Sequence, residues 1–245
     1  MSTAAAIVVA AGPGTRLGAA LPKAFVELAG SPLVIRSLRA LLGAPSVSSA
    51  VVVVPPGSVD AAQALIDAHG PWRCAVTVVG GGAERQDSVR NGLAAVGAAD
   101  LIAIHDAARP FVRAEVVEAV IAAAERHGAA IAAAPATDTV KHVHRDGWIE
   151  STPPRERSWL AQTPQVFRAE LIRAAHAQAR DRHAPATDDA MLVEQLGTRV
   201  YVVPGNVENR KITTPEDLRW AEWLLTQPPS EPTGSRAATR RSGSR

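Results

Sequence analysis

Apolar runs that alternate with helix-like segments limit the fold of this chain more than any other feature of its sequence. The runs are residues 4–9, 50–54, 75–79, 101–105 and 129–134. Between each pair of runs, apolar residues at helical spacing and typical helix-end residues predict a helix. These helices are residues 31–42, 57–69, 83–96 and 114–127. A repeated strand-helix order folds into a mostly parallel, twisted sheet with helices on both faces, so we predict a three-layer, Rossmann-like α/β fold.

The alternation breaks at Pro135. Residues 139–144 and 148–151 are short alternating runs joined by Arg145-Asp146-Gly147, and Asp-Gly between such runs is a strong hairpin signal. We predict a β-hairpin arm over about 135–159 that projects from the α/β body. A two-stranded arm is only marginally stable alone, so we expect it to pack on a second copy of the protein.

The regular pattern returns after the arm, and the chain is long enough for one large domain. We predict a short strand at 165–167, helices near 169–179 and 188–196, a strand at 199–203 and a last helix at 214–225. Hydrophobic residues make up 47% of the 245 residues, mostly as Ala and Val, which gives ample material for a core. We therefore predict a single domain over residues 1–226.

The composition of the chain argues against a nucleic-acid-binding protein and against a membrane protein. Residues 227–245 carry four arginines against one glutamate among Pro and Ser, which predicts a disordered basic tail. No aromatic side chain interleaves with these arginines, so nucleic acid is not an expected partner. The chain has no run of about 20 apolar residues and no basic segment at its start, so we expect no membrane association and a cytoplasmic protein. The single cysteine, Cys74, is expected to pack in the core.

The segment 10–23, AAGPGTRLGAALPK, follows the first apolar run and has the composition of a phosphate-binding loop. Its glycines let a polyanion approach main-chain N–H groups, and Arg16 and Lys23 add fixed positive charge. The loop has neither the GK[ST] ending of a P-loop nor the GxGxxG pattern of a dinucleotide site. It predicts a phosphate site of another kind.

Two further polar segments follow predicted strands. Residues 80–82 are three glycines, with Arg85 and Ser88 just beyond, and Asp106 stands where the fourth strand runs out. Ligands of such sheets bind at the carboxyl ends of the strands, so these segments should meet the glycine loop. A carboxylate at the place of Asp106 suits Mg²⁺ that carries a nucleotide phosphate, whereas His105 is better explained as strand-end packing than as a base.

Taken together, these motifs resemble the 2-C-methyl-D-erythritol 4-phosphate cytidylyltransferase family over residues 4–226. They are AAGPGTRLGAALPK at 10–23, GGGAERQDSV at 80–89, HDAARP at 105–110, DTVK at 138–141, the Arg155 region, QTPQVF at 162–167, TDDA at 187–190 and ENRKITTPEDL at 208–218. The first motif alone indicates only the wider nucleotidyltransferase superfamily. The later motifs narrow the resemblance to this family.

The resemblance implies a transferase of the non-mevalonate isoprenoid pathway. It would move a cytidylyl group from CTP to 2-C-methyl-D-erythritol 4-phosphate, giving 4-diphosphocytidyl-2-C-methyl-D-erythritol and pyrophosphate. It also implies Mg²⁺ or another divalent cation as cofactor. The partner would be a second copy of the chain, in a homodimer whose 135–159 arm completes the active site of the neighbouring subunit.

The same resemblance assigns roles to residues. Arg16 and Lys23 would stabilise the transition state and the departing pyrophosphate, while Arg155 and Lys211 would position the acceptor phosphate. The implied nucleotide-binding residues are Ala10, Ala11, Gly12, Gly14, Gly81, Gly82, Arg85 and Ser88. The implied acceptor-side residues are Asp106, Ala107, Arg109, Thr139, Thr163 and Thr187, with Asp106 as the metal ligand and Glu208 or Asn209 as its alternative helpers.

Departures from the family pattern and competing functions stay open at this point. Ala24 and Ala83 replace more usual polar residues, and Arg210 beside Lys211 leaves open which of the two cations faces the phosphate. Thr187 and Asp188 also suit a helix N-cap. A cytidylyltransferase for another polyol phosphate, such as ribitol 5-phosphate, would share the nucleotide motifs. A noncatalytic nucleotide-binding subunit and a nicotinamide-dependent dehydrogenase are alternatives of other classes.

Overall fold

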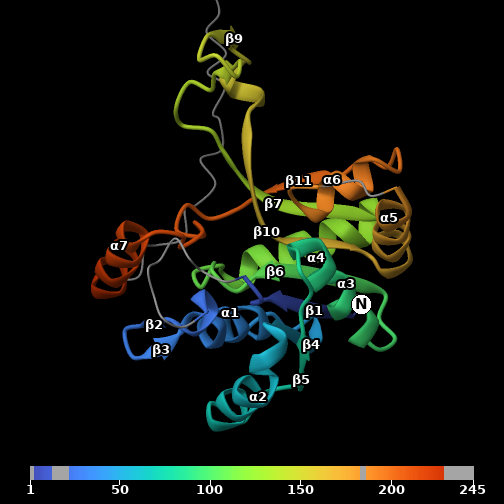
Figure 1. Ribbon diagram of the computed structural model, residues 1–245, viewed down its shortest axis with the longest axis vertical. Helices are drawn as coiled ribbons and strands as arrows, with labels where there is room; N and C mark the ends of the chain where they lie inside the picture. The colour runs from blue at the N-terminus through green and yellow to red at the C-terminus, as the bar shows by residue number, and fades with distance from the viewer. Residues whose placement is uncertain (1–2, 13–21, 183–185, 229–245) are drawn as a thin grey trace, which may run out of the picture.

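The central sheet runs in the order β11-β7-β10-β6-β1-β4-β5 in the part of the chain that the structure describes. The structure is a computed structural model that describes residues 3–12, 22–182 and 186–228 (Figure 1). The strands are β1 (Ala4–Val9), β4 (Val47–Val54), β5 (Ala75–Gly80), β6 (Leu101–Asp106), β7 (Ala129–Pro135), β10 (Trp159–Arg168) and β11 (Tyr201–Pro204). Only β10 runs antiparallel to its neighbours β6 and β7; the other pairs in this sheet are parallel. The predicted mostly parallel α/β fold is confirmed.

Several sequence predictions fall outside the described residues. These are Gly14, Arg16 and Gly18 of the glycine loop and most of the predicted basic tail, residues 229–245. Lys23 begins a short 3-10 helix, η2 (Lys23–Phe25), but its side chain is likewise outside the description.

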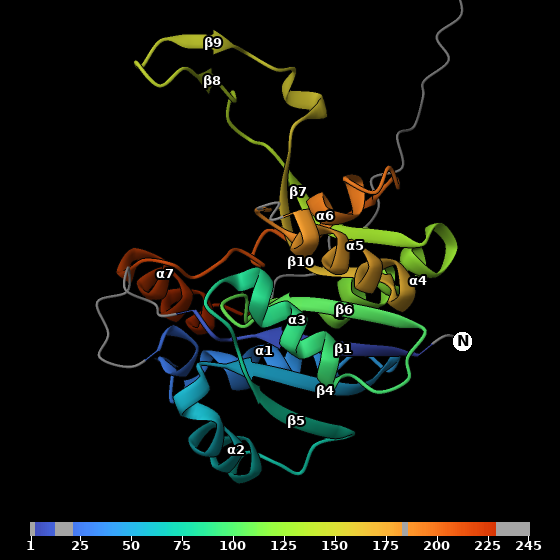
Figure 2. The same ribbon diagram turned by 45° about the vertical axis from the view of Figure 1, so that its right-hand side comes forward.

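Helices cover both faces of the sheet because side chains alternate along each strand. They are α1 (Leu33–Leu42), α2 (Val59–Ala68), α3 (Arg85–Ala95), α4 (Ala114–His127), α5 (Ala169–Arg182), α6 (Asp189–Glu194) and α7 (Pro215–Thr226). In β1, Ala6 and Val8 join a core cluster with α1, α2 and α4, and Ala5 and Ile7 join a second cluster with α3, α5 and α6. The three-layer arrangement follows, with α7 packed at one end against Leu28 and neighbouring apolar side chains (Figure 2).

Most predicted elements are confirmed, and the differences have local causes. Helix α4 has the predicted bounds and ends at Gly128, whose left-handed backbone (φ 87°) suits glycine. Helix α1 begins later than predicted, since Ser31–Pro32 forms the small strand β3 paired with β2 (Glu27–Leu28). The predicted helix 57–69 is a 3-10 turn, η3 (Pro56–Ser58), followed by α2.

The largest error concerns β10, which is ten residues long, whereas the sequence predicted a strand only over 165–167. Its middle holds Gln162, Thr163 and Gln165, which are buried although polar. A search for runs of apolar residues misses a strand whose buried positions hold polar residues. Partners far away in the sequence satisfy these side chains.

The projecting arm is confirmed as a hairpin, although with shorter strands than predicted. Strands β8 (His142–Val143) and β9 (Ile149–Ser151) pair antiparallel, and Gly147 takes a positive φ of 93° in the turn. The arm leaves the body after β7 and returns through η4 (Arg155–Arg157) into β10 (Figures 1 and 2). Among the described helices, none is long and apolar enough to cross a bilayer.

Candidate active site

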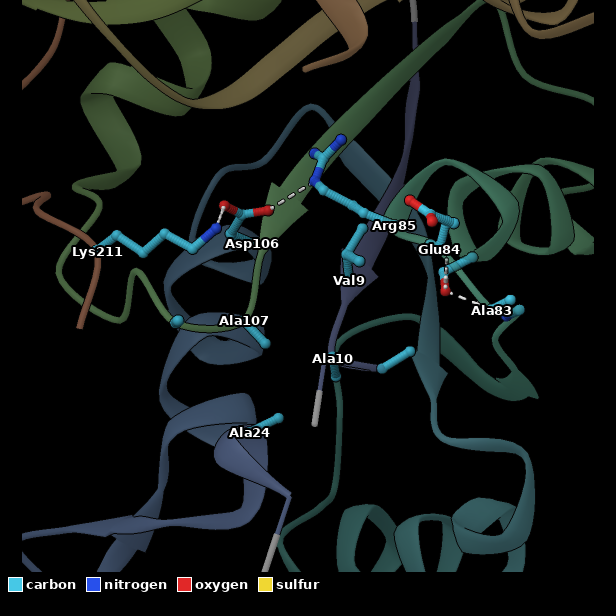
Figure 3. A pocket seen from close by; sticks show the side chains of 14 residues that line it. Val9, Ala10, Ala24, Ala83, Glu84, Arg85, Asp106, Ala107 and Lys211 are labelled. Atoms are coloured by element: carbon cyan, nitrogen blue, oxygen red, sulfur yellow. Dashed lines mark hydrogen bonds and ion pairs between the residues drawn. The ribbon is translucent and has the colours of Figure 1, made fainter. Parts of the chain in front are cut away.

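A pocket of about 260 Å³ lies at the carboxyl ends of β1 and β6 and at the start of α3 (Figure 3). Its lining residues are Val9, Ala10, Ala11, Gly12, Ala24, Gly82, Ala83, Glu84, Arg85, Ser88, Asp106, Ala107, Ala108 and Lys211. Most of these side chains are small. Besides the exposed Glu84, the charged lining residues are Arg85, Asp106 and Lys211. The pocket is therefore walled by main chain and small side chains and has charged side chains at one end (Figure 3).

Close packing against neighbouring side chains explains the glycine at position 81, in the wall after β5. A Cβ atom added to Gly81 would lie 2.6 Å from the Cβ of Ala11 and 2.7 Å from Oγ of Ser88, so no larger residue fits. The N–H of Gly82 donates to Ser88 Oγ at 3.1 Å, and that hydroxyl donates to the carbonyl oxygen of Glu84 at 3.1 Å. This wall leads directly into the N-terminus of α3, where main-chain N–H groups favour anions.

Asp106 is the centre of the charged end. It is only 8% exposed, and its Oδ1 lies 3.3 Å from Nε of Arg85 while its Oδ2 lies 2.7 Å from Nζ of Lys211 (Figure 3). Burial opposes ionisation of the carboxyl group, but the two cations outweigh burial and hold the pKa of Asp106 well below its usual range. The carboxylate is ionised at neutral pH and pairs two cations from distant parts of the chain.

Lys211, and not Arg210, faces the pocket. Arg210 points outward, where its Nη2 lies 2.7 Å from Oδ1 of Asp217 and its guanidinium stacks 4.7 Å from the ring centroid of Trp220. Ile212 is fully buried and its N–H donates to the carbonyl oxygen of Ala108 at 2.8 Å. That bond fixes the segment beside the end of β6 and directs Lys211 toward Asp106.

A buried polar layer lies behind Asp106. Thr163 Oγ1 accepts from the N–H of Asp106 at 3.1 Å and lies 3.0 Å from Nδ1 of His105. His105 Nε2 donates to the carbonyl oxygen of Arg109 at 3.1 Å, and burial lowers the pKa of His105 to about 4. His105 is a neutral packing residue, as the sequence predicted, and Thr163 supports the Asp106 backbone from behind the pocket wall.

The remaining acceptor-side candidates of the body do not line this pocket. Arg109 donates to the carbonyl oxygens of Asn209 (2.7 Å) and Ala161 (3.3 Å), and burial lowers its pKa. Asn209 is buried and donates to the carbonyl oxygen of Thr163 at 2.8 Å, while Glu208 lies 3.1 Å from Arg113. These contacts give Glu208 and Asn209 structural partners near the site.

Three predicted residues stand apart from the pocket. Thr139 and Arg155 belong to the arm, where Arg155 Nη1 donates to the carbonyl oxygen of Thr137 at 3.4 Å. Thr187 is exposed before α6 and contacts Met191, whereas Asp188 forms the helix N-cap by accepting from the N–H of Met191 at 3.0 Å. Of the candidates, the pocket lining brings together Ala10, Ala11, Gly12, Gly82, Arg85, Ser88, Asp106, Ala107 and Lys211. Gly81 is not among the lining residues, Gly14 falls outside the described residues, and the arm candidates do not line the pocket.

Sequence patterns did not reveal two buried residues that hold Arg85 from the other side. Asp189 Oδ2 lies 2.8 Å from Nη1 of Arg85, and Asp189 Oδ1 lies 3.0 Å from Nε2 of His176. Both Asp189 and His176 are almost fully buried. The two consecutive acidic residues of the TDDA motif were a signal in the sequence. A helix needs only one N-cap residue, so the other carboxylate is available for a different contact.

The predicted metal site rests on a single carboxylate. No group of three or more His, Cys, Asp or Glu side chains gathers at one place among the described residues. Mg²⁺ requires only one or two carboxylates when substrate phosphates supply other oxygen ligands. Asp106 fits that requirement, although both of its oxygens contact cations in this arrangement.

Comparison with known proteins decides which nucleotidyltransferase the pocket belongs to. The model of the 2-C-methyl-D-erythritol 4-phosphate cytidylyltransferase family matches residues 4–227. The chain belongs to this family. Among curated members, the protein from Pelotomaculum thermopropionicum is 46% identical over 226 residues, which are 92% of this chain and 95% of that protein. The member from Geobacter metallireducens is 45% identical over 227 residues, 91% of this chain and 97% of that protein.

Solved structures of the family have the same fold. The 4-diphosphocytidyl-2C-methyl-D-erythritol synthase of Anaerococcus prevotii superposes with a TM-score of 0.82 at 28% identity, covering 92% of this chain and 99% of that one. The cytidylyltransferase of Thermus thermophilus gives a TM-score of 0.73 at 36% identity, covering 91% and 98%. The resemblance drawn from the motifs is confirmed.

Proposed function

We propose that this member of the family catalyses the reaction that names it, the transfer of a cytidylyl group from CTP to 2-C-methyl-D-erythritol 4-phosphate. The products are 4-diphosphocytidyl-2-C-methyl-D-erythritol and pyrophosphate, an intermediate and a by-product of isoprenoid synthesis by the non-mevalonate route. The observation that carries the proposal is the Lys211–Asp106 pair, 2.7 Å long, at the end of a glycine-walled pocket. A cation beside a candidate nucleotide pocket supports the binding of a second anionic substrate there.

The chemistry needs positioned charge more than it needs a base. The acceptor phosphate is already ionised near neutral pH, so the obstacle is to bring two polyanions together and to stabilise the charge that develops on the α-phosphate. His105, with its pKa lowered to about 4, is neutral and buried, which agrees with a reaction without a general base. We assign Arg16 and Lys23 to the nucleotide phosphates, as the family motif implies.

Lys211 is proposed to exchange partners when the acceptor arrives. Its side chain is 40% exposed, whereas that of Asp106 is 11% exposed, so the lysine is the member of the pair that an incoming anion can reach. An acceptor phosphate at the pocket mouth would take Lys211 Nζ, and Asp106 would gain a free oxygen. Lys211 would thus pair with Asp106 before the acceptor binds and with the acceptor phosphate afterwards. Binding of the acceptor would thereby free one oxygen of Asp106.

Asp106 is also our proposed protein ligand for Mg²⁺ or another divalent cation. The cation would supply charge neutralisation at the CTP phosphates, and Asp106 would hold it to the end of β6. We expect Asp106→Asn to weaken binding of Mn²⁺ to the protein–CTP complex, measured by electron paramagnetic resonance. Unchanged Mn²⁺ binding in that variant would remove Asp106 from the metal site.

We propose further that the protein acts as a homodimer joined through the arm. Val143, Trp148 and Ile149 of the arm are 56%, 76% and 61% exposed, and large exposed apolar side chains of this kind mark association surfaces. A neighbouring arm would also bring Thr139 and Arg155 to a pocket that the arm residues of the same subunit do not line. Since CTP is a cytoplasmic metabolite, we propose the cytoplasm as the place of action.

Incubation of the pure protein with CTP, Mg²⁺ and one acceptor at a time tests the proposed reaction. We expect pyrophosphate release with 2-C-methyl-D-erythritol 4-phosphate and little with ribitol 5-phosphate. Release with ribitol 5-phosphate alone would move the protein to the competing polyol specificity. CTP binding without release of pyrophosphate from either acceptor would favour a noncatalytic subunit. NAD binding in a titration would favour the dehydrogenase alternative.

A further inference from the structure

Five charged or titratable side chains form a continuous line from the core between α5 and α6 to the mouth of the pocket. In order they are His176, Asp189, Arg85, Asp106 and Lys211, joined by contacts of 3.0, 2.8, 3.3 and 2.7 Å. The inner two are 2% and 1% exposed, and the outermost is 40% exposed. The line therefore starts in the protein interior and ends where substrates bind.

Arg85 stands in the middle of this line and contacts the carboxylates on both sides of it. Its side chain begins at the first residue of α3 and crosses the pocket wall to reach Asp106 (Figure 3). Nη1 makes the shorter ion pair, with buried Asp189, and Nε makes the longer one, with Asp106. The two carboxylates together raise the pKa of Arg85, although burial opposes them. The guanidinium is thus a fixed charge held between two acids.

Asp189 is itself held on several sides. Its N–H donates to Oε1 of Gln165 at 3.1 Å, and its Oδ1 accepts from His176 Nε2. Since a carboxylate oxygen can only accept, the imidazole carries a proton on Nε2. A buried carboxylate is costly unless charged and hydrogen-bonding partners surround it. Here Arg85 and His176 are those partners.

We propose that Asp189, oriented by His176, is a positioning residue that holds Arg85 at the nucleotide pocket. Without it, Arg85 keeps only the longer contact to Asp106. The guanidinium would then turn fully onto that carboxylate, compete with Lys211 for its oxygens and leave the CTP side of the pocket. Asp189 thereby keeps Arg85 on the CTP side of the pocket and leaves Lys211 available for the acceptor phosphate. This inference rests on the proposed function, because it assigns Arg85 to CTP.

Asp189→Asn tests the proposal, with CTP affinity as the main readout. The variant keeps the size of the side chain and removes its charge. We expect the Kd and KM for CTP to rise about tenfold, which lies within the usual coupling between charged residues in contact, while kcat changes less. His176→Ala should raise both constants in the same direction, and His176→Gln, which keeps an N–H donor near the place of Nε2, should restore them.

A double-mutant cycle with Arg85→Met separates positioning from general stabilisation. If Asp189 acts through Arg85, Asp189→Asn changes CTP binding little once Arg85 is gone. The same loss of affinity with and without Arg85 would overturn the proposal. So would a lowered melting temperature with an unchanged Kd for CTP. If Asp189→Asn does not fold, His176→Ala and His176→Gln can each be combined with Arg85→Met in the same double-mutant cycle.

Asp188→Asn is the matched control. Asp188 precedes Asp189 and caps α6 through the N–H of Met191, and its Oδ2 accepts from Nε2 of Gln165 at 2.9 Å. We expect this variant to melt at a lower temperature and to bind CTP as the unmodified protein does. A weaker affinity equal to that of Asp189→Asn would trace the effect to α6 as a whole and overturn the proposal. Absence of CTP binding by the unmodified protein would instead refute the proposed function.

Discussion

The pocket and the arm place cations in opposite surroundings. In the pocket, Arg85 and Lys211 are fixed by carboxylates behind them, and the walls are main chain and small side chains. In the arm, which carries large exposed apolar side chains, Arg155 is exposed and donates to one carbonyl oxygen at 3.4 Å. Charge in the pocket is organised before a ligand arrives. Charge in the arm needs another surface to organise it, which is the physical reason to expect a second subunit there.

Lys23→Ala should have the largest effect on the pocket side of this comparison. We expect kcat to fall by at least about 10²-fold, as loss of one preorganised charge contact to a transition state commonly does. Steady-state release of pyrophosphate measures it. Arg219→Ala is the control, because Arg219 is an exposed cation of α7 paired with Glu216. Near-normal turnover of Lys23→Ala would remove the glycine loop from catalysis.

Subunit mixing tests whether the arm serves a neighbouring pocket. Lys23→Ala and Arg155→Ala should each be nearly inactive alone. In a random mixture, half of the dimers are mixed and each of these regains one intact site, so we expect about a quarter of the unmodified activity from a two-fold dimer. Activity that stays at the level of the separate variants would mean that each arm serves its own chain, contrary to the separation seen here.

A smaller effect concerns the free energy of unfolding as a function of pH. It should arise from His105 behind the pocket and not from the arm. Burial lowers the pKa of His105 to about 4 in the folded protein, whereas an unfolded chain has about 6.5. Between these values the unfolded state binds the extra proton, so the free energy of unfolding should decrease as pH falls from about 6.5 to about 4. The loss is up to about 3 kcal/mol.

Chemical denaturation at a series of pH values measures this loss. His105→Asn should flatten the dependence in that window, since asparagine does not titrate. His142→Asn is the control from the arm, where His142 is exposed and contacts Ser151. Comparison of the two variants separates the buried imidazole from an exposed one. A slope that survives in His105→Asn would assign the pH dependence to another group.

Local sequence predicted those parts of the molecule that local forces decide. Apolar runs and helix-end residues located most strands and helices, including α4 with its glycine cap. Local patterns also indicated most of the residues that line the described pocket, because glycines and charges follow strands that end at one edge of the sheet. The hairpin of the arm was found from its Asp-Gly turn, although its strands are shorter than the alternating runs.

Long-range contacts account for what the sequence could not predict. Gln165 is buried in β10 because its Oε1 accepts from the N–H groups of Asp189 and Ala190, a partnership that no local pattern reveals. Lys211 faces the pocket because it pairs with Asp106, which is distant in the sequence. Arg210 points outward, where it stacks on Trp220. Asp189 was assigned no role from the sequence, because its partner Arg85 lies far earlier in the chain.

The smallest effect is expected from deletion of residues 227–245, the predicted basic tail. Helix α7 ends at Thr226, so the cut leaves the described elements intact. We expect kcat and the KM for CTP to stay within about twofold, the range of changes remote from packed or charged contacts. Steady-state kinetics at low and at moderate salt would check this, since the four arginines of the segment would act on anionic substrates most strongly at low salt. A large loss confined to low salt would add a third source of positive charge to those of the pocket and the arm.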